Sequence, residues 1–190
     1  MVDPYQPAES EQRQMRGILE AILSRPPRVF TLQTRGPLIL RDLDLLLSFP
    51  TGLRVSFSVP TNRNEVLKLY EPHAPSFEER MHTIHMLADA GIETYATLAP
   101  LLPCDLEQLA TQMIEATGRD LIGDPLHIRE VKPRGATTRE AAYRISEVHG
   151  FTEWLNPQFQ AEAVSRIQTT AARLGKTFAT GPAGFARLAI

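Results

Sequence analysis

Leu53-Arg54-Val55-Ser56-Phe57-Ser58-Val59 decides the fold class, because apolar and polar residues alternate along it until Pro60-Thr61 ends the run. A period of two predicts a β-strand. Residues 29–35, before Gly36-Pro37, and residues 92–98, before Ala99-Pro100, show similar runs, and a helical pattern follows each strand. Alternating strands and helices build parallel sheets, which bind ligands at the carboxyl ends of their strands. The sequence therefore predicts an α/β fold.

The remaining elements extend this pattern along the chain. A fourth strand is predicted over residues 126–131, and all four strands should form one parallel sheet in sequence order. Helices are predicted over residues 8–24, 40–49, 62–70, 76–90, 105–117, 138–148 and 158–174. Ser76 and Glu79 form a capping box, and Gly91 suits the end of that helix. Residues 132–138 are the expected boundary between a barrel part, 1–135, and a helical C-terminal extension, 136–190.

Composition limits the class of protein. The 190 residues suit one domain, and 43% hydrophobic and 22% charged residues are ordinary for a globular protein. A net charge of −2 gives no basic surplus, so nucleic acid as a partner receives no support. The single cysteine excludes an internal disulfide. Neither a signal segment nor a membrane-spanning run is visible, and we therefore expect a cytoplasmic protein with no membrane partner.

Four segments together carry a family pattern: Asp3-Pro4-Tyr5-Gln6-Pro7, Leu40-Arg41-Asp42-Leu43-Asp44-Leu45-Leu46, Glu71-Pro72-His73-Ala74-Pro75-Ser76 with Arg80, and Ala99-Pro100. They resemble the radical S-adenosyl-L-methionine (SAM) superfamily, in the branch similar to spore photoproduct lyase that is often described as DNA-repair-photolyase-like. The resemblance implies a partial (β/α) TIM-type barrel. It also implies lyase-like chemistry, in which a [4Fe-4S] cluster reduces SAM to a 5′-deoxyadenosyl radical that abstracts hydrogen from a substrate.

The resembling proteins carry a Cys-x-x-x-Cys-x-x-Cys loop upstream of the Asp-Pro-Tyr-Gln-Pro segment. Here that segment begins at residue 3, and Cys104 is the one cysteine of the chain. A [4Fe-4S] cluster needs at least three cysteines from the protein. We therefore expect the C-terminal part of a radical SAM protein, truncated at its N-terminus, which by itself neither binds the cluster nor cleaves SAM.

The absence of the first barrel units has a structural consequence. The strand at 29–35 should lie at a sheet edge, with apolar surface partly uncovered beside it. The chain's own C-terminal helices, another chain or a second copy would have to cover that surface. Self-association or a partner at the open edge is therefore expected.

The resemblance also assigns cofactor-binding residues. Arg35 stands where the family usually has the lysine of Thr-Lys-Ser, near the methionyl carboxylate, whereas Gly36 lacks the serine hydroxyl. Ser58 would face the barrel interior and bind the ribose or the amino group. Arg80 would approach the carboxylate or the ribose, and Pro100 would line the adenine. The residues alone allow plainer interpretations: two solvated charges for Arg35 and Arg80, and a small residue filling a barrel layer for Ser58.

Metal and thiol chemistry receive weaker support. His82 and His85 lie three apart on one predicted helix, but no third ligand has a suitable spacing, so we predict no metal site and a half-buried pair on an amphipathic helix. Cys104 could donate hydrogen to a radical or act as a stray cluster ligand. It is more simply a small apolar residue near a helix N-terminus.

Two other functions stay open at this stage. One is a binding or accessory protein without a cluster, which pairs through its open barrel edge. The other is a metal-independent βα enzyme that acts on a phosphorylated or carboxylated metabolite through Arg35 and Arg80. Whether the chain is an enzyme on its own is left open, and no catalytic residue is assigned.

Overall fold

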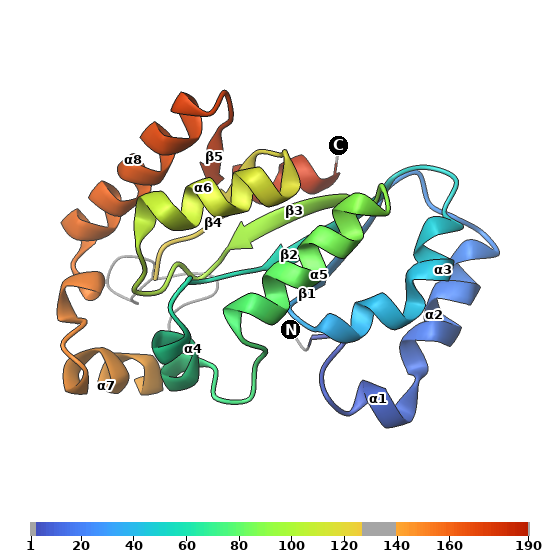
Figure 1. Ribbon diagram of the computed structural model, residues 1–190, viewed down its shortest axis with the longest axis horizontal. Coiled ribbons are helices and arrows are strands. Elements are labelled where there is room, and N and C mark those ends of the chain that lie inside the picture. The colour runs from blue at the N-terminus through green and yellow to red at the C-terminus, as the bar shows by residue number, and fades with distance from the viewer. Residues whose placement is uncertain (1–2, 127–139, 190) are drawn as a thin grey trace.

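The computed structural model describes residues 3–126 and 140–189. This part of the chain forms one sheet of five parallel strands, which follow one another in sequence order (Figure 1). Its members are β1 (Phe30–Thr34), β2 (Leu53–Ser58), β3 (Glu93–Leu98), β4 (Leu121–Gly123) and β5 (Phe178–Thr180). Each neighbouring pair is parallel. The predicted parallel order of the first three strands is therefore confirmed, as is the edge position of β1 among the described strands, and the fold is mixed α/β.

The fourth strand differs from the prediction. We predicted residues 126–131, whereas β4 is Leu121–Gly123 and pairs with the end of β3. Leu126 lies in the following loop, and 127–131 are outside the described residues. The preceding helix ends at Gly118, in a left-handed conformation (φ +63°), so the chain reaches the sheet earlier than its apolar pattern indicates.

The fifth strand was not predicted at all. β5 contains three residues, which is too short for an alternating pattern to be recognised. It pairs with β4, so the segment beyond the expected boundary contributes a strand to the same sheet. The boundary at 132–138 itself falls outside the described residues.

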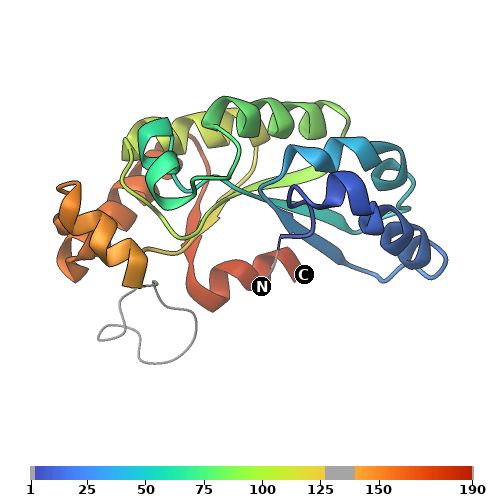
Figure 2. The ribbon, with the colours of Figure 1, turned by 90° about the horizontal axis from the view of Figure 1, so that it is seen from below.

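Helices cover one face of the sheet and a short C-terminal helix lies against the other (Figure 2). The α-helices are α1 (Glu9–Gln12), α2 (Gln14–Leu23), α3 (Leu43–Leu47), α4 (Asn64–Tyr70), α5 (Phe77–Asp89), α6 (Leu106–Thr117), α7 (Glu140–Val148), α8 (Pro157–Arg173) and α9 (Gly181–Ala186). Three 3₁₀ turns accompany them: η1 (Pro37–Asp42), η2 (Thr152–Leu155) and η3 (Arg187–Ala189). The predicted capping box of Ser76 and Glu79 is present at the start of α5.

The predicted helix over 8–24 is broken at Arg13, which has a left-handed backbone (φ 49°). The Glu9 carboxylate turns toward the start of α2 and accepts hydrogen bonds from the N–H groups of Gln14 and Met15. Arg41 donates to the same carboxylate at 2.8 Å. These contacts satisfy the first donors of α2 and offset the cost of the break. The predicted helix over 40–49 is likewise split into η1 and α3.

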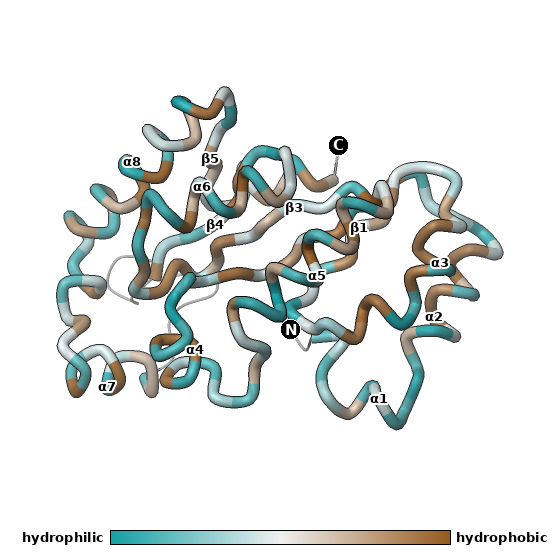
Figure 3. Tube along the Cα trace, in the orientation of Figure 1, coloured by the Kyte–Doolittle hydropathy of each residue, from teal (hydrophilic) through white to brown (hydrophobic). Residues whose placement is uncertain are grey.

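The two faces of the sheet have different chemistry. Val55 and Phe57 of β2 are fully buried in the apolar core with residues of the covering helices, such as Leu87 and Leu109. The other face carries polar side chains, because strand residues alternate between faces. On it the hydroxyls of Ser56 and Thr97 lie 2.5 Å apart. Figure 3 colours the chain by hydropathy, with much of α3 hydrophobic and α1 mostly hydrophilic.

The C-terminal segment, 181–189, lies on the polar face near the start of β1 and β2. Thr31 donates a hydrogen bond to the carbonyl of Leu188, and Arg54 donates to the carbonyl of Arg187. Gly184 packs directly on β5, where a Cβ would come within 2.7 Å of the Ala179 backbone. The chain's own C-terminus therefore covers part of the face that the helices leave open. Among the described helices, none is both long and apolar enough to cross a membrane.

Candidate functional site

The carboxyl ends of β1 and β2 bring together charged residues from four parts of the chain. Asp3 comes from the N-terminal loop, Arg35 from the end of β1, Glu71 from the loop after α4 and Arg80 from α5. Thr34 pairs with Phe57 in the sheet, so Arg35 continues one step beyond β1 beside Ser58. This is the edge of a parallel sheet at which ligands usually bind.

Asp3 fastens the N-terminal loop to the end of β1. One carboxylate oxygen accepts hydrogen bonds from the Thr34 hydroxyl (2.6 Å) and the Tyr5 N–H (2.9 Å). The other accepts from the N–H of Arg35 at 2.8 Å. A Cβ at Gly36 would overlap the carbonyl oxygen of Tyr5. The close approach of this loop therefore explains why position 36 is a glycine.

Arg35 is the accessible cation of the site. Its guanidinium donates a hydrogen bond to Glu71 Oε1, and its Nε lies 3.7 Å from Asp3 Oδ2. The side chain is nevertheless 39% exposed. It borders a cavity of about 590 Å³ whose other polar walls include Asp3, Glu71 and His73. Arg35 can therefore reach a ligand in this cavity.

Arg80 has a different position, because its side chain is completely buried. It donates to Glu71 Oε2 at 2.6 Å, to the carbonyl of Ser58 at 2.9 Å and to the carbonyl of Pro75 at 3.1 Å. Burial lowers the pKa of Arg80, although Glu71 opposes this change. The guanidinium ties the end of β2 to the 71–75 loop, and Arg80 holds other residues in place instead of presenting its charge to solvent.

Ser58 lies at the same edge with a hydroxyl that lacks a protein partner. The residue is 5% exposed, and within the described residues its Oγ makes no hydrogen bond. Its neighbour Ser56 points to the same face and is satisfied by Thr97. A buried hydroxyl without a partner costs about 1–3 kcal/mol, so a water or ligand atom at Ser58 would be favourable.

Pro100 is exposed and follows β3 through a cis peptide bond with Ala99. Of the four predicted residues, Arg35 lines the 590 Å³ cavity, whereas Ser58, Arg80 and Pro100 do not. Contacts nevertheless join three of them, Arg35 and Arg80 through Glu71 and Ser58 through Arg80. Asp3 and Glu71 were not predicted as site residues. Their signal was present in the Asp-Pro-Tyr-Gln-Pro and Glu-Pro segments, but their contacts depend on the fold.

The other candidates of the sequence do not form sites. His82 and His85 are both exposed on α5, not half-buried as predicted. No group of three or more His, Cys, Asp or Glu side chains suited to a metal exists within residues 3–126 and 140–189.

Burial raises the pKa of the Cys104 thiol well above its ordinary value. Cys104 borders a cavity of about 520 Å³ beside Arg63 and Arg166, but both arginines are paired with glutamates.

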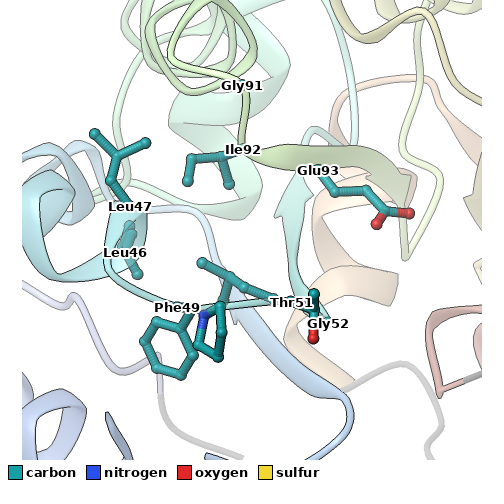
Figure 4. Close-up of a pocket in the computed structure, with 10 residues that line it drawn as sticks. Leu46, Leu47, Phe49, Thr51, Gly52, Gly91, Ile92 and Glu93 are labelled. Atoms are coloured by element: carbon teal, nitrogen blue, oxygen red, sulfur yellow. The ribbon is translucent and has the colours of Figure 1, made fainter.

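A smaller cavity of about 260 Å³ lies at the opposite, amino end of the strands. In Figure 4, Leu46, Leu47 and Ile92 lie on one side of it, and the Glu93 side chain extends away from them. Glu93 is already engaged by the Tyr95 hydroxyl at 2.6 Å and by Arg54. This cavity lacks convergent polar groups, so the carboxyl edge of the sheet remains the better candidate.

Comparison with known proteins gives relatives without an assigned activity. No protein-family model matches the chain. An uncharacterized protein, MJ0683, of Methanocaldococcus jannaschii is 32% identical over 101 residues, which cover 53% of this chain and 38% of that protein. The uncharacterized protein ORF301 of Acidianus two-tailed virus is 27% identical over 136 residues, 67% of this chain and 44% of that protein.

A third relative is the uncharacterized protein Rv2578c of Mycobacterium tuberculosis, 32% identical over 139 residues. The match covers 67% of this chain and 39% of that protein. The chain therefore spans less than half the length of these curated relatives.

Proposed function

We propose that this chain is the C-terminal part of a cytoplasmic radical SAM protein similar to spore photoproduct lyase. In this proposal the sheet is a fragment of a TIM-type barrel that binds SAM at the carboxyl ends of its strands. The observation that carries it is the presence, at the same edge of the sheet, of an accessible Arg35 and of a buried Ser58 hydroxyl that has no partner among the described residues. The family resemblance of the surrounding segments supplies the identity of the ligand.

The charges of the site suit an amino-acid head group. Arg35 and Arg80 contribute two positive charges, and Asp3 and Glu71 contribute two negative charges, so the formal charges of the site cancel. A ligand with both a carboxylate and an ammonium can pair with this arrangement without a net electrostatic cost. Arg35 would bind the carboxylate, since guanidinium and carboxylate pair in a bidentate manner. Ser58 would bind the amino group or a ribose hydroxyl, and Pro100 remains a proposed wall for the adenine.

The [4Fe-4S] cluster does not fit these residues. The chain contains one cysteine, and burial raises the pKa of its thiol, which disfavours the thiolate that iron requires. In the family, bound SAM supplies radical chemistry only beside a reduced cluster. No cluster-dependent step is therefore assigned to these 190 residues, whose role is to bind and orient the cofactor. An electron paramagnetic resonance signal of a cluster, or 5′-deoxyadenosine formed by this chain alone, would refute this part.

Calorimetric titration with S-adenosylhomocysteine, which retains the carboxylate, ammonium and ribose, tests the proposal. We expect Arg35→Gln to weaken binding by about tenfold or more, since a charge-assisted pair is lost. Ser58→Ala should weaken it by about threefold, as for one neutral hydrogen bond. Arg63→Gln, at an arginine that borders the other large cavity, is the control and should bind like the wild type. Absence of wild-type binding would refute the SAM assignment.

A second candidate function is pairing through the open edge of the sheet. Among the described strands, β1 has β2 as its one neighbour. Phe30 donates its N–H to Gly52 toward β2, so alternate residues such as Gln33 direct theirs to the free edge. An accessory protein would use this edge to join a second copy or another strand. Self-association in light scattering that Gln33→Pro abolishes and Gln33→Ala retains would support it, whereas a monomeric wild type would count against it.

The third candidate, a metal-independent enzyme for a phosphorylated or carboxylated metabolite, shares Arg35 with the first. It is distinguished by its ligand. Binding of simple anions without any binding of S-adenosylhomocysteine would favour it over the SAM proposal.

A further inference from the structure

The Glu71 carboxylate lies between two guanidinium groups that differ in accessibility. Its Oε1 accepts from Arg35, and its Oε2 accepts from Arg80 at 2.6 Å. Arg80 is completely buried, whereas Arg35 is 39% exposed and borders the 590 Å³ cavity. One carboxylate therefore bridges a fixed cation and an accessible one.

We propose that Glu71 is an internal competitor for the ligand anion: it occupies Arg35 in the free protein and gives it up when a carboxylate or phosphate group binds. The inference rests on the proposed role of Arg35 as an anion-binding residue. It adds a regulatory contact, because the affinity for the ligand then depends on how much more strongly the Arg35 guanidinium binds the ligand anion than the Glu71 carboxylate.

The difference in burial between Arg80 and Arg35 determines which of the two Glu71 contacts can open. Arg80 also donates to the carbonyls of Ser58 and Pro75, so its guanidinium cannot leave Glu71 without losing its position. A buried charge without a partner is costly, which keeps the Glu71–Arg80 contact closed. Arg35 is anchored by its backbone N–H, and its side chain reaches solvent. The contact between Glu71 and Arg35 is therefore the one that a ligand can replace.

Asp3 cannot take over the same role. Its two oxygens are held by the Tyr5 and Arg35 N–H groups and by the Thr34 hydroxyl, and Arg35 Nε lies 3.7 Å away. That separation is longer than a hydrogen bond. Asp3 contributes negative charge near the ligand position, but Glu71 alone makes a direct hydrogen bond to the Arg35 guanidinium among the residues that the structure describes.

Titration with inorganic phosphate and with acetate tests the inference without the cofactor. We expect Glu71→Gln to bind phosphate about fivefold more tightly than the wild type, or about 1 kcal/mol, as for loss of one competing ion pair at a partly exposed arginine. The double variant E71Q/R35Q should lose the gain. Glu65→Gln, which removes an exposed carboxylate paired with Arg63, is the matched control and should leave phosphate binding unchanged. Equal or weaker phosphate binding by Glu71→Gln would overturn the inference.

Nuclear magnetic resonance of the arginine Nε–H groups keeps the test decisive if Glu71→Gln does not fold. In the wild type, phosphate should shift the Arg35 signal and leave the Arg80 signal in place. A shift of Arg80, or of neither group, would overturn the inference. Failure of the SAM proposal has a different signature, namely no binding of S-adenosylhomocysteine by any variant while the response to phosphate follows the pattern above.

Discussion

The Thr31 hydroxyl donates a hydrogen bond of 2.8 Å to the carbonyl of Leu188, across 157 positions of the chain. Thr31 lies on β1, at the edge of the sheet, and Leu188 belongs to η3 at the C-terminus. The contact joins the first strand to the last turn on the face that carries polar side chains. The C-terminal segment thus covers the starts of β1 and β2, at the opposite end of these strands from Arg35 and Ser58.

Thr31→Val should loosen this cover. Valine keeps the volume of threonine but cannot donate to Leu188, and we expect the free energy of unfolding to fall by about 1 kcal/mol. Urea unfolding followed by circular dichroism measures the change. Thr31→Ser retains the hydroxyl and serves as the control. Equal stability of the valine variant and the wild type would show that the contact contributes nothing.

Substitutions of Arg80 and of Arg35 should have different effects on the free energy of unfolding. Arg80→Gln removes one partner of a buried ion pair, and we expect a loss of about 3–5 kcal/mol in the free energy of unfolding. Arg35→Gln removes a partly exposed side chain and leaves Glu71 paired with Arg80, so it should cost less than about 1 kcal/mol. Urea titrations of both variants under identical conditions test the contrast. Similar losses in the two variants would contradict the positioning role of Arg80.

Gly36→Ser should be poorly tolerated, although serine is the usual residue of the resembling family. Its Cβ would overlap the Tyr5 carbonyl, and overpacking of this kind costs about 1–3 kcal/mol. Gly17→Ala is the matched control, because a Cβ in the middle of α2 meets nothing within 4 Å. That change should stabilise the protein by about 0.5–1 kcal/mol. Thermal unfolding of both variants checks the opposite signs.

Local sequence patterns were sufficient for much of the fold. The alternation around Phe57 predicted β2, and the Ser76–Glu79 pair predicted the start of α5, because both signals lie within a few residues. The break at Arg13 could not be predicted in the same way, since it depends on Glu9 meeting Arg41, 32 positions away. β4 and β5 contain three residues each, which leaves no period to detect.

The candidate site likewise combines features that local sequence patterns indicate with contacts that depend on the fold. The sequence pattern places Arg35 directly after a strand and Ser58 in an alternating run, but their assignment as cofactor-binding residues came from the family resemblance and stays a prediction. The bridging role of Glu71 and the complete burial of Arg80 could not be predicted, because both arise where α5 packs against the end of β2. Spacing along the chain gives the type of residue at the strand ends, but only the fold determines which charges compensate one another.

Glu9 should make stability depend on pH in the acid range. Burial raises the pKa of Glu9, but the hydrogen bonds from Arg41 and from the Met15 and Gln14 N–H groups outweigh it and lower that pKa below its ordinary value. A carboxyl with a lower pKa in the folded state stabilises the fold above its unfolded pKa of about 4.3, and the contribution is lost as the pH falls below that value. Urea unfolding at neutral pH and at a pH below about 4 should show the loss. Glu9→Gln should have a flatter profile, and an equally steep one would exclude Glu9 as the source.

Cys104 should react slowly with thiol reagents in the folded protein. Burial raises the pKa of its thiol well above the ordinary value, and Asp105 adds to this effect, so little thiolate exists near neutral pH. Because the thiolate is the reactive form, we expect modification by Ellman's reagent at pH 8 to be at least about tenfold slower than in the unfolded chain. The chain has one cysteine, so the colour change reports this residue alone. Concentrated guanidinium chloride provides the unfolded reference. Reaction of the native protein at the unfolded rate would show that Cys104 is an accessible thiolate, and would reopen its role as a ligand or hydrogen donor.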